Sequence, residues 1–194
     1  MEEQELTQRF HKTFDAVLPI LENVYKGFFA NNSTILKKCL SDFESILTAN
    51  LPFVEKIVTE KEKDPIEIKY VNQVLSLQVI ALALDNLIAK MLVKAESATL
   101  FSDKATKEIK SLLEITYSQF KDTKDYILTK NPILKQNVLA AKEKLIDLVT
   151  DYDVVHQNRL ITGICMPKAS YLYIDMTSSL KRIARGIADF TEKV

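Results

Sequence analysis

The scarcity of turn-forming residues limits the fold of this chain more than any other feature of its sequence. Its 194 residues include only three glycines and five prolines. Because Gly and Pro are the residues that most often interrupt regular structure, so few of them favour long helices over many short strands. Alternating apolar runs bounded by Gly-rich turns, which would predict strand pairs, are missing from the sequence. The sequence therefore predicts an all-α protein of long antiparallel helices joined by short loops.

Six helical segments follow from apolar residues at three- and four-residue spacing. Ser33 and Ser102 are predicted to cap two of them, and Pro132 is predicted at the first position of another. Pro19 and Pro52 lie inside helical patterns. Pro19 is expected to kink its helix or to mark a frayed start, and Pro52 is expected to kink its helix near Leu51. The predicted segments are 5–30, 34–60, 66–94, 103–129, 132–160 and 168–194.

The order of these segments suggests a duplication. STILKKCLSD, which starts at Ser33, resembles NPILKQNVLA, which starts at Asn131. Each half of the chain would then be a three-helix bundle, the first over residues 1–97 and the second over residues 98–194. The connector near Ala98 is neither long nor rich in glycine, so the two bundles are expected to pack together.

The charge balance argues against a nucleic-acid-binding protein. The chain has 26 basic and 26 acidic residues, whereas a general nucleic-acid binder needs net positive charge to meet phosphates. Cys39 and Cys165 are too few for a disulfide framework and have no zinc-binding spacing. The first residues, MEEQELTQRF, lack the basic and apolar regions of a signal peptide. We expect a cytoplasmic protein, with peripheral association at a membrane as an open alternative.

One segment, 74–93, is long and apolar enough to resemble a membrane span. It is interrupted by Gln78, Asp85, Asn86 and Lys90. Charged side chains are costly inside a bilayer. We therefore predict that this segment is a central helix of a soluble protein, buried on most sides.

Catalytic chemistry has little support in the sequence. His11 and His156 are the only histidines, and no nucleophile elbow, phosphate-binding loop or zinc-protease motif is present. Each histidine is predicted to be a surface or helix-packing residue. Glu143 and Asp147, four residues apart, share a helix face and are the best pair for a metal ion. A solvated ion pair and a contact with a partner protein are the alternatives for this pair.

Three cations, Lys181, Arg182 and Arg185, lie near the end of the last segment. If neighbouring helices are antiparallel, Arg185 is level with Asp147 and Lys181 with Asp151. Ion pairs there, if exposed, would contribute roughly 0–1 kcal/mol each. The alternative is an outward basic patch for an acidic partner or an anion.

The second half of the chain resembles the PhoU family, and most closely the PhoU-like domains attached to sodium/phosphate cotransporters. The similarity covers 100–194, in the stretches LFSDKATKEI, HQNRLITGICMPKASYLYIDM and SSLKRIARGIADFTEKV. The first half resembles the family mainly in helix layout and in LALDNL, residues 82–87. The matching positions are His156, Arg159, Leu160, Gly163, Cys165, Pro167, Ala169, Leu180, Arg182, Ile183 and, in the first half, Asp85.

The resemblance implies a fold of two three-helix repeats, in agreement with the segmentation above. It implies a non-enzymatic regulator of phosphate uptake that binds a membrane phosphate transporter or a sensor kinase, and a homodimer is a further expectation from the family. Family members often bind metal clusters through E-x-x-x-D motifs. An iron, zinc or other divalent metal site is thus implied by the resemblance.

This sequence departs from the family at those metal-binding motifs. Lys181 and Arg185 stand where the last helix of the family has Glu and Asp, and Ala81 replaces the Glu that precedes Asp85. A metal cluster needs several carboxylates to offset its charge. We therefore expect no bound metal, with Lys181 and Arg185 as cations in place of the cluster.

The predicted function is a PhoU-like regulator or adaptor of phosphate transport that lacks the usual metal cluster. Candidate partner surfaces are the charged turn 60–64 and the basic patch formed by Lys181, Arg182 and Arg185. The alternative is a metal-binding helical bundle, whose candidate ligands are Asp85, Glu143 and Asp147. A helical-bundle enzyme is a third reading, which no motif supports.

Overall fold

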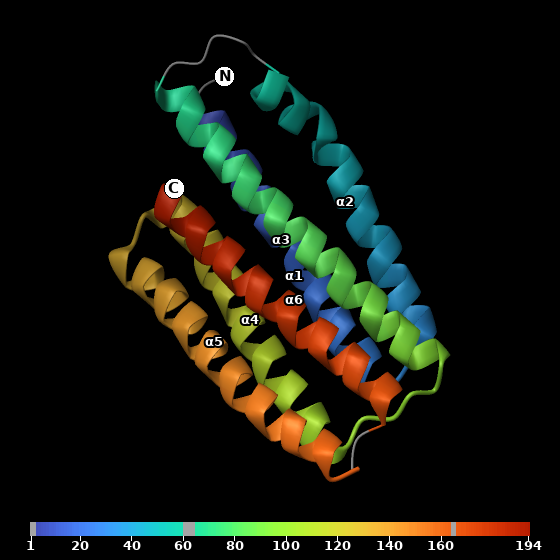
Figure 1. Ribbon diagram of the computed structural model, residues 1–194. Helices are drawn as coiled ribbons and strands as arrows, with labels where there is room; N and C mark the ends of the chain where they lie inside the picture. Colours follow the sequence, from blue (N-terminus) through green and yellow to red (C-terminus); the bar gives the residue numbers. More distant parts are fainter. Residues whose placement is uncertain (1–2, 60–64, 164–165) are drawn as a thin grey trace.

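The computed structural model describes residues 3–59, 65–163 and 166–194. Six long helices and no strand occur in these ranges, which confirms the all-α prediction (Figure 1). Cys165 and the charged turn 60–64 lie outside the described residues. The helices are α1 (Glu3–Phe29), α2 (Ser33–Thr59), α3 (Pro65–Glu96), α4 (Asp103–Thr129), α5 (Pro132–Ile161) and α6 (Pro167–Lys193).

The helices pack as two groups of three that share a long interface. α1 and α3 each contact α2, and α4, α5 and α6 all contact one another. The two groups meet where α3 lies along α6 and α1 lies along α4 (Figure 1). Gly186 permits close contact of α3 with α6, because a Cβ at this position would lie 2.8 Å from Ile80 Cγ1.

A cluster of aromatic rings joins the two groups in the core. Phe190 on α6 lies 5.3 Å from Phe10 and 5.0 Å from Phe14, measured between ring centroids, and both partners are on α1. Phe14 also lies 5.5 Å from Phe120 on α4. Such contacts stabilise a core beyond the area that they bury. α1, α4 and α6 therefore form one continuous core across both halves of the chain.

Side-chain caps fix several helix ends. The Ser102 hydroxyl accepts a hydrogen bond from the Ala105 N–H, as predicted, and Asn131 caps α5 ahead of Pro132. The predicted cap at Ser33 is wrong. The Asn32 side chain accepts the hydrogen bond from the Ile35 N–H instead, and Ser33 is the first residue of α2. Asn and Ser are near-equal caps, so the local sequence did not distinguish them.

The prediction that α3 is buried on most sides is wrong. Within α3, the 27-residue stretch Tyr70–Glu96 is long and apolar enough to cross a membrane. However, only 44% of its most apolar 18-residue segment is buried. Leu75, Val79 and Leu82 are 48%, 42% and 65% exposed. The reason is that α3 has an outer position in the bundle, where only α2 and α6 cover it extensively. One apolar face of α3 is therefore left at the surface.

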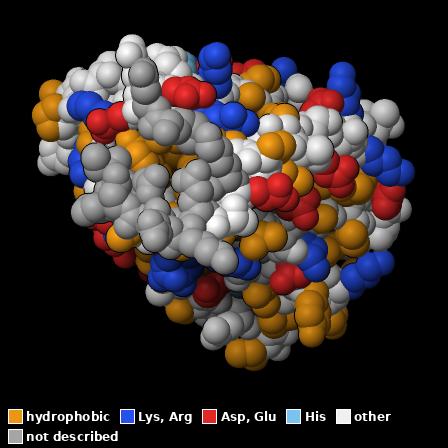
Figure 2. Space-filling view, turned by 90° about the horizontal axis from the view of Figure 1, so that it is seen from above, with side chains coloured by type: hydrophobic (Ala, Val, Ile, Leu, Met, Phe, Trp, Pro, Cys, Tyr) orange, Lys and Arg blue, Asp and Glu red, His pale blue; other side chains and the backbone are white. Residues whose placement is uncertain are grey.

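The end of the bundle near the α2–α3 turn carries charges of both signs. Figure 2 shows Lys and Arg side chains interspersed with Asp and Glu side chains on this face, beside hydrophobic atoms. Among the side chains drawn in colour, neither sign dominates. This arrangement agrees with the balanced composition of 26 basic and 26 acidic residues.

Candidate functional site

The three predicted cations lie on the outer side of α6. Arg182 and Arg185 are exposed and Lys181 is half-exposed. α6 contacts α3 on one side and α5 on the other, so its outward face lies between these two helices (Figure 1). The exposed positions of this face are Tyr171, Ile174, Ser178, Arg182, Arg185, Asp189 and Glu192.

The ion pairs predicted for these cations are not formed. Salt bridges between described residues include none from Lys181, Arg182 or Arg185, although α6 does carry one elsewhere, with Asp175 2.8 Å from Lys90 on α3. Lys181 interacts electrostatically with a different carboxylate, that of Asp153 on α5. Burial raises the pKa of Asp153, and the positive charge of Lys181 partly offsets that rise. Equal rise along neighbouring helices predicted that Lys181 would be level with Asp151. Asp153 is two residues further along α5, which is about half a helical turn.

The three candidate metal ligands are not brought together. Asp85 is on α3, Glu143 and Asp147 are on α5, and these two helices make no contact in the described part of the chain. Glu143 is exposed and lies 2.7 Å from Lys142 in an ion pair. Within the described ranges, no group of three or more His, Cys, Asp or Glu side chains could hold a metal ion. α6, with its cations, lies between the helices that carry the carboxylates.

A buried network of charged and polar side chains joins the beginning of α4, the end of α5 and the beginning of α6. Glu108, only 5% exposed, accepts hydrogen bonds from both terminal nitrogens of Arg159, at 3.1 and 2.8 Å. The Tyr173 hydroxyl donates to the same carboxylate at 2.6 Å. Burial raises the pKa of Tyr173, and the hydrogen bond to Glu108 raises it further. Burial would lower the pKa of Arg159, but Glu108 outweighs this effect and raises it.

His156 extends this network. Its ring stacks on Tyr173 at 4.6 Å, its Nδ1 faces the Arg159 Nη2 at 3.5 Å, and its Nε2 lies 2.6 Å from the Ser170 hydroxyl. Because Arg159 can only donate, Nδ1 accepts, and Nε2 therefore carries the proton and donates to Ser170. A base that activates a serine must accept the serine proton, so this pair does not form a nucleophilic dyad. His156 is a helix-packing residue, as predicted.

The environment of His156 favours its neutral form. Burial lowers the pKa of His156 below its usual 6.5, and the charge of Arg159 lowers it further, while Glu108 and Asp153 partly offset these effects. In the unfolded chain this histidine titrates near pH 6.5. Below that pH the unfolded state binds a proton that the folded state does not, so acid favours unfolding.

We therefore expect the free energy of unfolding to fall as the pH falls below about 6.5, by up to about 1.4 kcal/mol per pH unit from this one group. Urea unfolding at a series of pH values measures the slope. His156→Gln should remove this part of the slope, since an amide does not titrate. His11→Gln is the matched control, because it makes the same substitution at the other histidine, a half-exposed position outside this network. Equal slopes for the wild type and His156→Gln would contradict the assignment.

Sequence reasoning missed Glu108 as a partner of Arg159. A signal was present: Ala105, Ile109 and Leu112 are buried on the apolar face of α4, and Glu108 shares this face at helical spacing. A carboxylate on such a face is rarely left without a partner. The spacing could thus have indicated a buried acid, but its partner on α5 is 51 residues away and could not be identified locally.

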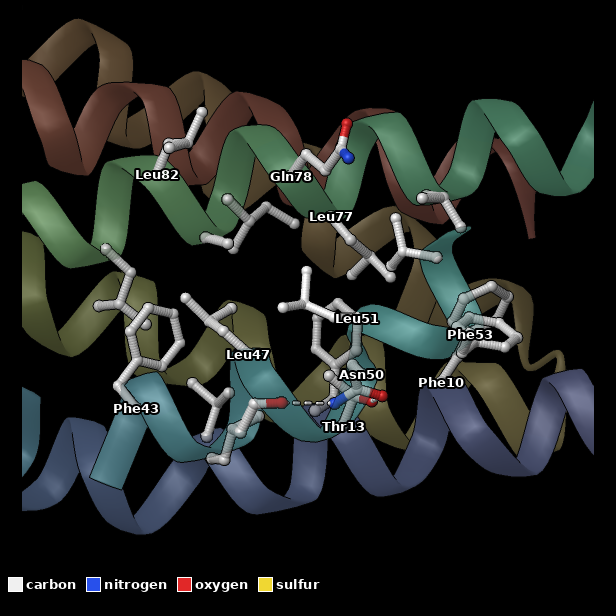
Figure 3. Close-up of a pocket in the computed structure, with 18 of the residues that line it drawn as sticks. Phe10, Thr13, Phe43, Leu47, Asn50, Leu51, Phe53, Leu77, Gln78 and Leu82 are labelled. Atoms are coloured by element: carbon white, nitrogen blue, oxygen red, sulfur yellow. Dashed lines mark hydrogen bonds between the residues drawn. The ribbon is translucent and has the colours of Figure 1, made fainter. Parts of the chain in front are cut away.

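An apolar groove lies between α1, α2 and α3. Its volume is about 520 Å³, and its described lining is apolar except for Thr13, Asn50 and Gln78. Figure 3 shows Phe10 and Phe53 at one end of the groove, and Leu47 and Leu51 on α2 facing α3. We call this feature the α1–α2–α3 groove.

Comparison of the chain with family models, with curated proteins and with solved structures finds no match. The PhoU-like assignment therefore stays a prediction from the sequence motifs. Among the motif residues, the structure places His156 and Arg159 in the buried network and Ala169 in the core-facing side of α6.

Proposed function

We propose that the protein is a non-enzymatic, cytoplasmic PhoU-like regulator of phosphate transport that binds an acidic segment of a membrane transporter or sensor kinase. The observation that carries the proposal is the unpaired state of the α6 cations. Arg182 and Arg185 are exposed and make no ion pair with a described residue. This holds although Asp189 follows Arg185 by four residues on α6 and Asp147 was predicted to be level with Arg185 on α5. Exposed cations without internal partners are suited to an external anionic group.

The surroundings of these cations support a protein partner. On the outward face of α6, exposed Tyr171 and Ile174 precede the cations, and Asp189 and Glu192 follow them. A surface with aromatic, basic and acidic parts in one row can fix the register of a partner as well as attract it. Because the helix beneath is anchored in the core, these side chains are presented on a rigid support.

The same residues support the charge-replacement hypothesis. Lys181 and Arg185 lie on the helix between α3, which carries Asp85, and α5, which carries Asp147. Fixed cations there reduce the need for a metal ion to neutralise the carboxylates. We expect elemental analysis of tag-free protein to find no stoichiometric iron, zinc or manganese, and the Lys181→Glu/Arg185→Asp variant to bind metal. Stoichiometric metal in the wild type would contradict the hypothesis.

The regulatory proposal is tested in cells that lack the chain and receive it back as wild type or variant. Uptake of radiolabelled phosphate should change on deletion and return with the wild type. Arg182→Glu/Arg185→Glu should behave like the deletion, because it reverses the charge that meets the partner. Lys104→Glu/Lys107→Glu on α4 is the matched control, with the same change in net charge at exposed positions, and should behave like the wild type. Unchanged phosphate uptake on deletion would overturn the proposal.

A further inference from the structure

The α1–α2–α3 groove has the size and depth of a small-molecule site. Its volume of about 520 Å³ falls within the range of roughly 300–1,000 Å³ that is usual for ligand pockets. Its walls include Phe14, Val74 and Leu84, which are at most 1% exposed, so the groove reaches the core. A volume of this size with a floor in the core favours a small apolar ligand.

The lining determines the chemistry of such a ligand. No charged side chain is among the described residues that line the groove, and aromatic and branched aliphatic side chains predominate. On α2 the lining runs from Phe43 to Phe53, which spans about 15 Å at the rise of a helix. A groove of this length with an apolar lining matches one extended alkyl chain. The rim includes Leu51 and Leu82, which are 51% and 65% exposed and leave the groove open to solvent.

A cation lies beside the end of the groove that Phe53 forms. The Arg9 guanidinium lies over the Phe53 ring, with Cζ 4.5 Å from the centroid. Its Nε donates to the Asn50 Oδ1 at 3.4 Å, and its Nη2 donates to the Ala49 carbonyl at 3.3 Å. Two of its five N–H donors are thus used, both in long bonds. Arg9 makes no ion pair with a carboxylate in the described part of the chain, so its charge is available to an external anion.

We infer that the groove binds a free long-chain fatty acid, with the alkyl chain in the groove and the carboxylate at Arg9. Guanidinium and carboxylate form charge-assisted hydrogen bonds of matching geometry. Thr13 and Asn50 lie at the edge of the groove and hold Arg9 there, because the Thr13 hydroxyl donates to the Arg9 carbonyl and the Asn50 Oδ1 accepts from the Arg9 Nε. The apolar chain removes from water the side chains that the groove leaves exposed. This inference is independent of phosphate regulation, because the groove and the α6 cations are formed by different helices.

Chain length provides the first test. Titration calorimetry of the full chain with octanoate, decanoate and dodecanoate should show saturable one-to-one binding that tightens by about fourfold per added methylene. The gain should stop once the chain exceeds the groove, so octadecanoate should bind little better than hexadecanoate. No saturable binding, or affinity independent of chain length, would overturn the inference.

Variants locate the headgroup and the tail. Arg9→Met keeps an apolar stem over Phe53 but removes the charge, and should weaken dodecanoate binding about tenfold or more while leaving the binding of methyl dodecanoate unchanged. Arg182→Met is the matched control and should bind dodecanoate like the wild type. Equal affinity of the wild type for the acid and the ester would overturn the role of Arg9.

Filling the groove tests its identity. Leu77→Trp on the inner wall and Leu82→Trp on the exposed rim should each weaken binding of both acid and ester. Leu82→Trp should leave the fold intact, because the Leu82 side chain is 65% exposed. Circular dichroism confirms that each variant is folded. Binding that neither variant changes would place the site elsewhere. A wild-type dimer that Leu82→Trp converts to a monomer, without fatty-acid binding in either form, would instead identify the groove as an interface between copies of the chain.

Discussion

Replacing Glu108 by alanine is expected to lower the free energy of unfolding by about 3–5 kcal/mol, since it leaves a buried cation unpaired. Arg159 is only 8% exposed, and both of its terminal nitrogens donate to Glu108. The Tyr173 hydroxyl would lose its acceptor as well. Equilibrium unfolding in urea, followed by circular dichroism near neutral pH, measures the loss.

Two comparisons separate the buried pair from a general effect of the substitution. Glu114→Ala on the same helix removes an exposed carboxylate from an ion pair with Lys110 and should cost less than about 1 kcal/mol. Glu108→Leu/Arg159→Met removes both buried charges and should be less destabilised than Glu108→Ala alone. If Glu108→Ala lost no more stability than Glu114→Ala, the buried pair would not have the importance assigned to it here.

Phe190→Ala is expected to cost about 3–5 kcal/mol of unfolding free energy, because it leaves a large cavity in the core. The Phe190 side chain is fully buried and contacts the rings of Phe10 and Phe14. These contacts join α6 to α1, and therefore the second half of the chain to the first. The loss should appear in both urea and thermal unfolding.

Tyr171→Ala is the matched control for this prediction. It removes an aromatic ring of similar size from the same helix, but Tyr171 is 77% exposed. Its replacement should change stability by no more than about 0.5 kcal/mol. A loss below 1 kcal/mol for Phe190→Ala would show that the core closes around the missing ring at little cost, contrary to the close packing expected of a protein interior.

Both positions matter for the proposed functions, since each anchors a helix that carries a candidate surface. Glu108 and Arg159 hold the first turns of α6 against α4 and α5 through Tyr173. Phe190 holds the last turns of α6 against α1. The part of α6 that carries the cations is thus held in the bundle at both ends.

Local signals in the sequence were sufficient for the helices and their ends. Every predicted boundary that lies in the described residues agrees within two residues, because apolar spacing, Ser102 as a cap and Asn131-Pro132 as a helix start act over a few residues. The one wrong cap, at Ser33, involved a neighbouring Asn32 of similar capping strength. Pro19 and Pro52 lie inside α1 and α2 at exposed positions, and each helix continues through its proline.

Long-range relations between helices required the tertiary structure. The apolar content of α3 predicted burial, but its outer place in the bundle leaves Leu82 exposed and opens the α1–α2–α3 groove. Antiparallel order predicted that Lys181 and Arg185 would pair with Asp151 and Asp147, yet neither pair is among the ion pairs of the described residues, and the charge of Lys181 affects Asp153 instead.

The sequence by itself determined an all-α chain of six helices, since helix formation depends on neighbours three and four residues apart. It also marked His156 and Arg159 as residues of interest. Only the tertiary structure decided that Glu108 neutralises Arg159 and that Arg9 stands beside an apolar groove. Those contacts join residues 40 to 51 positions apart, and their geometry depends on how whole helices pack, which no local pattern encodes.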